Sequence, residues 1–433
     1  MMRHITPIKL IAGAAMCGAM VLNGCSGRRG GGNSAADGND STAVVREAAA
    51  PVDDQVRLLI GRYSAPGENA LEAYSFDPET ASAQFLYEIP VENASFLDIS
   101  DRGVIYAVSE SGDKASQVTA LTLDPDGRQA HVLNRRPTGS ADPCHIRVSP
   151  DGRFVVTANY TGGTVAVFPV NADGSLGERR QLLTFGHDGK GAVPDRQEAP
   201  HPHCITFTPD GRRMLVDDLG NDAIHCFAVA QGADSLVASQ PDSAAKLEPG
   251  SGPRHLTFNA KGDMAYLINE LSDRVTVLKY DGTTLTPVQY IDADKNGAGG
   301  AADIHLSPDG KHLYASLRLK NDGITRFDVD PETGLLTYRG HTPTAAHPRN
   351  FTLTPDGRYM FVACRDGNRV QIFKVDEHTG SLIDKHRSIT LDKPVFVNFY
   401  PAPVRQTTVQ RHSKKFGGAV KLSYLWADTK HDR

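Results

Sequence analysis

Several features that mark other classes of protein are missing from this sequence. The net charge is only −5 over 433 residues, so no broad basic surface is available for nucleic acid. The six cysteines form no Cys-x-x-Cys pair, which leaves a zinc ribbon or a thioredoxin-type redox site without support. Neither a calcium-loop spacing of acidic residues nor a Gly-x-Ser-x-Gly nucleophile elbow occurs. We therefore expect no nucleic-acid partner, no metal, no other cofactor and no serine-hydrolase chemistry.

The N-terminus carries an export signal instead of a membrane span. After a short basic start, residues 10–22 form a run of thirteen apolar and small residues, short of the roughly 20 that span a bilayer. The run ends in Leu22-Asn23-Gly24-Cys25, which resembles the lipobox of bacterial lipoproteins. Residues 1–25 are thus predicted to be a lipoprotein signal peptide, with acylated Cys25 holding the chain to a lipid bilayer. A signal cleaved without lipidation is the alternative.

The rest of the chain divides by composition. Ser26 replaces the Asp that often marks inner-membrane retention, which favours the periplasmic face of the outer membrane or the cell surface. Residues 26–54 are rich in Gly, Ser, Ala, Asn and Asp and predict a flexible tether. Residues 55–401 repeat a common unit, whereas residues 402–433 are basic, polar and outside the repeat, and form a C-terminal appendage.

The repeat predicts the fold. One unit reads CHIRVSPDGRFVVTAN from Cys144, and the same shape returns as HCITFTPDGRRMLVDD from His203. The turn glycines are Gly103, Gly152, Gly211, Gly262, Gly310 and Gly357, with successive spacings of 49, 59, 51, 48 and 47 residues. Such a period, built from short strands without helical periodicity, is typical of a propeller. Residues 56–78 supply a seventh unit, and residues 395–399 supply a last strand for the first blade. We therefore predict an all-β, seven-bladed β-propeller with four-stranded antiparallel blades.

Two positions of the repeat indicate a site. We count from the residue before the turn glycine, which is Asp151, Asp210, Lys261, Asp309 or Asp356. Seven residues earlier stand Cys144, His203, Arg254, Ala302 and Arg349. Nine residues later stand Tyr160, Leu219, Glu270, Arg318 and Arg365, with Glu110 in a weaker copy. Both offsets lie at the hairpin end away from the turn, so these residues should converge on one mouth of the central channel. A purely structural repeat would place the same residue in every blade, whereas these positions differ.

Longer stretches resemble a known family. Residues 253–280 (PRHLTFNAKGDMAYLINELSDRVTVLKY), residues 201–222, residues 158–168 and residues 347–357 are similar to the lactonase-type propellers. That family includes bacterial 6-phosphogluconolactonase and fungal carboxymuconate-lactonising enzymes. The resemblance implies a hydrolase that opens a sugar-acid lactone in carbohydrate metabolism. It also places His203, Arg254, Glu270 and Arg318 on the family's catalytic positions.

The chemistry of those residues suits lactone hydrolysis. Glu270 and His203 are the candidate bases for activating water, and Arg254 and Arg318 are candidates for binding an anion and the developing oxyanion. The candidate substrate-binding residues are His201, Glu110, Asn159, Arg349 and Arg365. No metal is needed for this scheme.

The sequence also departs from the family. Its Ser-Asn-Arg-Gly stretch appears here as Ser316-Leu317-Arg318-Leu319, which keeps the arginine and loses the Asn and the Gly. Export also conflicts with the lactone of 6-phosphogluconate, a cytoplasmic metabolite, so another sugar lactone is an open possibility. Two alternatives therefore stand beside a lactonase, namely a non-catalytic surface propeller that binds a carbohydrate or a protein partner, and a muconate-type lactonising cycloisomerase.

Overall fold

The computed structural model describes residues 56–400 except 113–115, 125–126, 190 and 231–234. The predicted signal peptide, the tether, Cys25 and the C-terminal appendage lie outside the described residues. Within them the regular secondary structure is β-strand, arranged as seven four-stranded sheets. Among the same residues no helix is long and apolar enough to span a bilayer.

Each blade takes four strands, all antiparallel to their neighbours. The first blade contains β1 (Val56–Arg62), β2 (Leu71–Asp77), β3 (Ser82–Ile89) and β28 (Pro394–Tyr400). The second contains β4 (Leu97–Ile99), β5 (Ile105–Ser109), β6 (Gln117–Leu123) and β7 (Ala130–Pro137). The third contains β8 (Pro143–Val148), β9 (Phe154–Asn159), β10 (Thr164–Pro169) and β11 (Gln181–Thr184). The fourth contains β12 (Pro202–Phe207), β13 (Arg213–Asp218), β14 (Ala223–Ala228) and β15 (Ser243–Lys246).

The last three blades follow the same plan. The fifth contains β16 (Pro253–Phe258), β17 (Met264–Asn269), β18 (Arg274–Tyr280) and β19 (Leu285–Asp292). The sixth contains β20 (Ala301–Leu306), β21 (His312–Leu317), β22 (Gly323–Val329) and β23 (Leu336–Pro343). The seventh contains β24 (Pro348–Leu353), β25 (Tyr359–Cys364), β26 (Arg369–Val375) and β27 (Leu382–Thr390).

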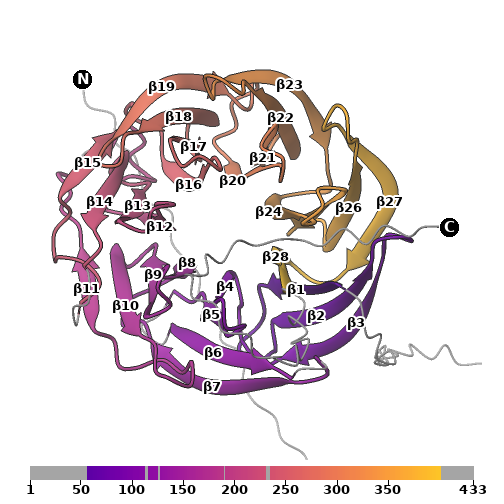
Figure 1. The fold of residues 1–433 in the computed structure, drawn as a ribbon, viewed down its shortest axis with the longest axis horizontal. Helices are drawn as coiled ribbons and strands as arrows, with labels where there is room; N and C mark the ends of the chain where they lie inside the picture. The colour runs from indigo at the N-terminus through magenta and orange to yellow at the C-terminus, as the bar shows by residue number, and fades with distance from the viewer. Residues whose placement is uncertain (1–55, 113–115, 125–126, 190, 231–234, 401–433) are drawn as a thin grey trace, which may run out of the picture. The chain divides into compact units, whose positions relative to one another are not determined.

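The blades form a closed ring. Figure 1 shows β4, β8, β12, β16, β20, β24 and β28 nearest the centre, one from each blade. The last strand, β28, pairs with β1 in antiparallel register, Leu59 opposite Asn398, and so completes the first blade with the end of the chain. The predicted seven-bladed propeller with four-stranded antiparallel blades is confirmed. This pairing joins the two ends of the described chain in one blade, and the innermost strand of each blade remains a short edge strand at the centre of the ring.

The hairpin turns require their glycines. Gly152 and Gly211 both have φ of 69°, and Gly357 has φ of 71°. This left-handed region suits glycine because a Cβ would clash with the backbone. Each turn ends the first strand of a blade at a fixed place, so the opposite ends of those strands also lie at equivalent heights in every blade.

The hydrophobic core lies between neighbouring blades. In the cluster between the fifth and sixth blades, Tyr266 and Ile268 pack with Leu313 and Phe327, all fully buried. Every residue of β9 is buried, as is every residue of β17, because these second strands are covered on both faces. A single sheet cannot bury two faces alone, so the stability of each blade depends on its neighbours.

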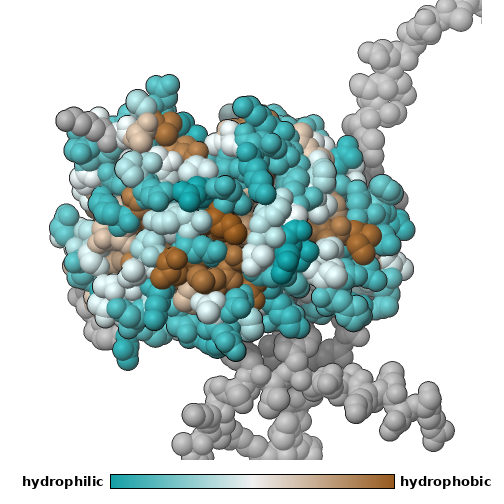
Figure 2. Space-filling view, turned by 90° about the horizontal axis from the view of Figure 1, so that it is seen from above, coloured by the Kyte–Doolittle hydropathy of each residue, from teal (hydrophilic) through white to brown (hydrophobic). Residues whose placement is uncertain are grey.

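The outer surface is mostly polar. The side view in Figure 2 shows hydrophilic residues in teal over most of this face, with brown apolar residues between them. The large apolar side chains that are exposed in the described part are Leu182, Val288, Leu319, Leu335 and Ile383. Only Leu319 of this set directly follows a predicted site residue, and its conformation is taken up below.

Candidate functional site

Several innermost strands contain a β-bulge, at which one residue has no partner on the neighbouring strand and its side chain leaves the usual alternation between the two faces of the sheet. On β12, Pro202 pairs with Asp218 and Cys204 with Asp217, so His203 between them has no partner on β13. The same register shift leaves Arg254 unpaired on β16. A bulge inserts an extra residue and re-aims its side chain. The sequence positions seven residues before the turn are therefore bulge positions, five in all, namely Cys144, His203, Arg254, Ala302 and Arg349.

The second set of predicted residues follows directly after the second strand of each blade. The backbone N–H of Glu270 donates to the carbonyl of Gly252 at 2.7 Å, and that of Arg318 donates to Gly300 at 3.1 Å. Both bonds tie the residue to the start of the innermost strand in its own blade. Each side chain consequently leaves the sheet at the same end as the bulge residue.

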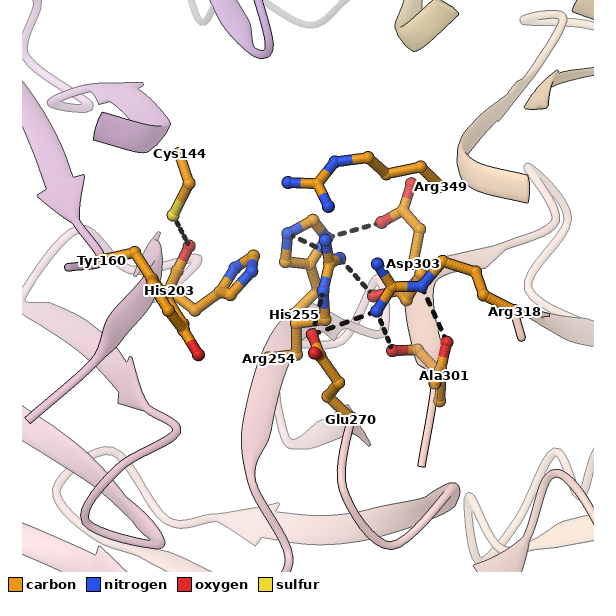
Figure 3. Close-up of polar contacts among 12 residues, drawn as sticks. Cys144, Tyr160, His203, Arg254, His255, Glu270, Ala301, Asp303, Arg318 and Arg349 are labelled. Atoms are coloured by element: carbon orange, nitrogen blue, oxygen red, sulfur yellow. Dashed lines mark hydrogen bonds and ion pairs between the residues drawn. The ribbon is translucent and has the colours of Figure 1, made fainter. Parts of the chain in front are cut away.

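The structure brings Arg254, Glu270 and Arg318 into direct contact, together with Arg196 (Figure 3 shows the first three). We call these four residues the axial cluster. Oε2 of Glu270 lies 2.9 Å from Nε of Arg254 and 3.1 Å from Nη2 of Arg318. Oε1 accepts a hydrogen bond of 2.7 Å from Nη2 of Arg196. One carboxylate is thus shared by three guanidinium groups.

This arrangement holds Glu270 in its ionised form. Burial alone would raise its pKa, but Arg318, Arg254 and Arg196 outweigh burial and hold the pKa far below its usual range. Burial lowers the pKa of Arg318 to about 10, with nearby Arg254 acting in the same direction. Arg318 therefore stays charged at neutral pH. A carboxylate that gives up its proton so readily is a weak base.

His203 has the opposite character. Its ring is 5.3 Å from that of His255 and 5.5 Å from that of Tyr160, in edge-on contact with both. Nδ1 is buried and has no hydrogen-bond partner among the described residues. Burial and the charge of Arg254 hold the pKa of His203 well below its usual value, so the imidazole is neutral at pH 7. Figure 3 shows the ring pointing toward Arg254 and His255.

Arg349 and Glu110 form a second pair at the same end. Nη2 of Arg349 lies 3.8 Å from Oε2 of Glu110, and the guanidinium lies 5.5 Å from the centre of the Tyr63 ring. The Tyr63 hydroxyl donates to Oε1 of Glu110 at 2.9 Å. Since Glu110 is engaged with Tyr63, Arg349 is only loosely compensated, and Figure 3 shows it directed toward the other arginines.

Three predicted binding residues do not present their polar groups to this cluster. Asn159 is the last residue of β9 and fully buried, and its amide donates to Thr164 within the blade at 3.0 Å. His201 uses both ring nitrogens, one against the carbonyl of Tyr160 and the other against Glu198. Neighbouring positions along a strand face opposite sides, and the residue after Asn159 is Tyr160, whose ring contacts His203.

Arg365 is the third of these residues. Its Nε and Nη2 lie 2.7 and 3.0 Å from the two carboxylate oxygens of Asp366, the next residue in the chain. A bidentate pair of this kind compensates the charge locally. Arg365 therefore adds little positive potential to the axial cluster, whereas Arg349 adds more than the sequence indicated.

Sequence reasoning missed Arg196, which lies in the connection between β11 and β12. This connection falls in the longest repeat spacing, the 59 residues from Gly152 to Gly211, and that excess length was the signal for an inserted functional loop. The loop is held by Gln197, fully buried, whose amide donates to the carbonyl of Leu219 at 2.9 Å. Arg196 also donates to the Tyr160 hydroxyl at 3.1 Å.

The departure at Leu319 has a structural consequence. Leu319 has φ of 82°, a left-handed conformation that suits the Gly of the family pattern, and it is 59% exposed. We expect Leu319→Gly to be more stable than Leu319→Ala by about 1 kcal/mol, because both remove the side chain but only glycine is unstrained at this φ. Urea unfolding of the two variants measures the difference, and equal stabilities would contradict backbone strain at this position.

Three further features of the described part concern a surface groove, metal-type clusters and the cysteines. A groove of about 870 Å³ lies at the turn end of the fifth and sixth blades, lined by residues such as Lys261, Asp309 and Asp330. No group of three or more His, Cys, Asp or Glu side chains among the described residues is placed to hold a metal ion. The four cysteines of the described part are unpaired thiols.

Comparison with known proteins agrees with the fold. The chain is 35% identical to a 6-phosphogluconolactonase of Formosa agariphila, over 75% of this chain and 94% of that protein. It is 30% identical to a 6-phosphogluconolactonase of Bacillus subtilis, over 78% and 97%. The structure of the Pseudomonas aeruginosa periplasmic gluconolactonase superimposes with a TM-score of 0.76 at 30% identity, covering 81% of this chain and 100% of that one. The family model described as "Lactonase, 7-bladed beta-propeller" matches residues 57–399, and the chain therefore belongs to this lactonase family.

Proposed function

We propose that this protein hydrolyses a sugar-acid lactone at the axial cluster. The observation that carries the proposal is the group of three arginines around one buried carboxylate, beside a neutral histidine whose Nδ1 has no hydrogen-bond partner within the described residues. Arginine N–H groups suit the carbonyl oxygen of a lactone as it becomes an oxyanion. The relatives named as lactonases support the same reaction class.

The roles follow from the charges. Arg254 and Arg318 stabilise the oxyanion and bind an acidic substituent, while Glu270 orders their guanidinium groups. His203 takes a proton from water as the water oxygen bonds to the carbonyl carbon. The ring C–O bond then breaks, and the alkoxide leaving group takes the proton from His203. We assign the base to His203 because its ring is unprotonated and its Nδ1 has no hydrogen-bond partner within the described residues, whereas both carboxylate oxygens of Glu270 are engaged by guanidinium groups.

The charge balance indicates an anionic substrate. Four arginines, Arg196, Arg254, Arg318 and Arg349, lie at this end with the carboxylates of Glu110 and Glu270. A bound carboxylate or phosphate would offset the surplus positive charge and raise the pKa of His203 toward neutrality. No step of this scheme uses a metal.

Export and anchoring complete the proposal. A related protein is named a periplasmic gluconolactonase, which supports a place outside the cytoplasm for this chain. The signal peptide and the lipobox around Cys25 support attachment to the periplasmic face of the outer membrane or to the cell surface. A lactone present in the cell envelope is then the substrate.

Hydrolysis of a lactone panel by the purified full-length protein tests the function. The panel contains 6-phosphogluconolactone, gluconolactone and a muconolactone, each corrected for spontaneous ring opening. We expect catalysed opening of at least one acidic lactone, and its rate relative to the others ranks the substrate classes. If no lactone opens faster than in buffer, the lactonase proposal fails and the non-catalytic binding propeller takes its place.

A further inference from the structure

A buried carboxylate lies behind the axial cluster and joins three blades. Asp303, on β20, is 2% exposed. Its Oδ1 accepts from Nδ1 of His255 at 2.7 Å, and its Oδ2 accepts from Nδ2 of Asn350 at 2.6 Å and lies 3.0 Å from Nε2 of His305. The bulge on β20 between Ala301 and Ile304 contains this residue. Asp303 is ionised, because His305 and His255 hold its pKa well below the usual range against the effect of burial.

The ionised Asp303 determines the tautomer of His255. A carboxylate only accepts hydrogen bonds, so the proton of a neutral His255 lies on Nδ1. Burial and the charge of Arg254 lower the pKa of His255 to about 4, which makes the ring neutral at pH 7. Nε2 of His255 then carries a lone pair and faces Nη1 of Arg254 at 3.2 Å.

Arg254 uses three of its five N–H groups against this protein framework. Nε donates to Glu270 at 2.9 Å, and Nη1 donates both to the carbonyl of Ala302 at 2.5 Å and to Nε2 of His255. The two N–H groups of Nη2 have no hydrogen-bond partner among the described residues. The guanidinium is therefore held on two sides, and its remaining fork is available to a ligand.

We propose that Asp303 and His255 are positioning residues that fix Arg254 so that Nη2 faces the substrate (Figure 3). This inference rests on the proposed function, since it assigns Arg254 to the oxyanion or the acidic group of the lactone. Asp303 orients His255 through Nδ1–H, and His255 accepts from Arg254. The groups that face His255 are Arg254 of its own strand, Asp303 of β20, His145 of β8 and His203 of β12.

The repeat supports a role beyond tying blades together. The residues that directly follow the bulge position are His145, Cys204, His255, Asp303 and Asn350 in successive blades. A purely structural clasp would repeat one residue type around the ring. Among these five positions, the only His–Asp contact within the described residues is that of His255 with Asp303, behind Arg254.

Four variants of the full-length protein separate positioning from structure. Asp303→Asn allows an amide N–H to donate to Nδ1 of His255, which moves the ring proton to Nε2 and sets two donors against each other at Arg254. We expect kcat/KM for the lactone to fall about 10–100-fold, because a misplaced guanidinium weakens both the binding of the acidic group and the stabilisation of the oxyanion. His312→Gln makes the matched change at another His–Asp pair of the same blade, where Nδ1 lies 3.0 Å from Oδ1 of Asp328 at the turn end, and should keep kcat/KM within about twofold. His255→Gln keeps an acceptor for Arg254 and should retain more activity than His255→Phe.

Nitrogen-15 NMR of the histidine rings gives a readout that does not depend on turnover. We expect the Nδ1–H tautomer for His255 in the wild type and the Nε2–H tautomer in Asp303→Asn. Binding of inorganic phosphate, measured by calorimetry, should weaken at least about tenfold in Asp303→Asn and stay unchanged in His312→Gln. An Nε2–H tautomer in the wild type, or equal losses in Asp303→Asn and His312→Gln, would overturn the positioning role. A wild type that opens no lactone would refute the proposed function alone, since tautomer and phosphate affinity are measured separately.

Discussion

Replacing His203 by glutamine is expected to lower kcat/KM for the lactone by about 10²–10⁴-fold, the usual contribution of a general base. Glutamine is similar in size and polarity but cannot take a proton from water. Nδ1 of His203 has no hydrogen-bond partner among the described residues, so the substitution breaks no hydrogen bond at that nitrogen and the fold should be retained. Steady-state kinetics with circular dichroism of the same sample measure both effects.

The pH profile distinguishes a base from a structural residue. Because the pKa of His203 lies well below 6.5, the unprotonated form should persist and kcat/KM should stay level from pH 7 to below pH 6. The acid limb should disappear in His203→Gln. His378→Gln, at an exposed histidine far along the chain, is the matched control and should behave like the wild type. Unchanged turnover in His203→Gln would return the base to Glu270.

Glu270→Gln is expected to damage stability and activity together. The substitution removes the negative charge that Arg196, Arg254 and Arg318 share, which leaves buried cations uncompensated. Breaking a buried ion pair by removing one partner costs about 3–5 kcal/mol. With the guanidinium groups no longer ordered, kcat/KM should fall about 10²–10³-fold, the range for loss of an oxyanion donor. Urea unfolding and lactone kinetics provide the two measurements.

A matched control exists in the same blade. Glu248 pairs with Arg274 at 2.6 Å, but its side chain is 55% exposed. Glu248→Gln makes the same chemical change at a solvated pair and should cost less than about 1 kcal/mol, with full activity retained. If Glu270→Gln were as mild as Glu248→Gln, the axial cluster would have neither the energetic nor the catalytic role given to it.

The repeat made much of the site predictable. Offsets counted from the turn glycines identified Arg254, Glu270 and Arg318, and these three meet in the structure. The offsets work because every blade starts and turns at equivalent heights around the ring. They do not reveal the bulges, since a register shift of one residue leaves no mark in a pattern of alternating apolar residues.

Two kinds of residue were harder to predict, namely those outside the repeat and those whose polar atoms are hydrogen-bonded within the fold. Arg196 lies in an inserted connection, so no other blade offers an equivalent position from which to infer it. Asn159 and His201 carry suitable chemistry, yet their polar atoms are satisfied by Thr164, Glu198 and the backbone of Tyr160. Hydrogen-bond partners of this kind come from distant parts of the chain and depend on its three-dimensional path.

The sequence by itself determined the propeller, the number of its blades and the end of the ring where unlike residues gather. These follow from short-range patterns of apolar residues, turns and repeat length, which act within each blade. Only the tertiary structure decided that Glu270 is held ionised by three arginines and that Asp303 stands behind Arg254. It also decided that His203 is neutral, with no hydrogen-bond partner for Nδ1 within the described residues. The physical reason is that charge and proton positions depend on distances of a few ångströms between blades, which closure of the ring sets and no single repeat contains.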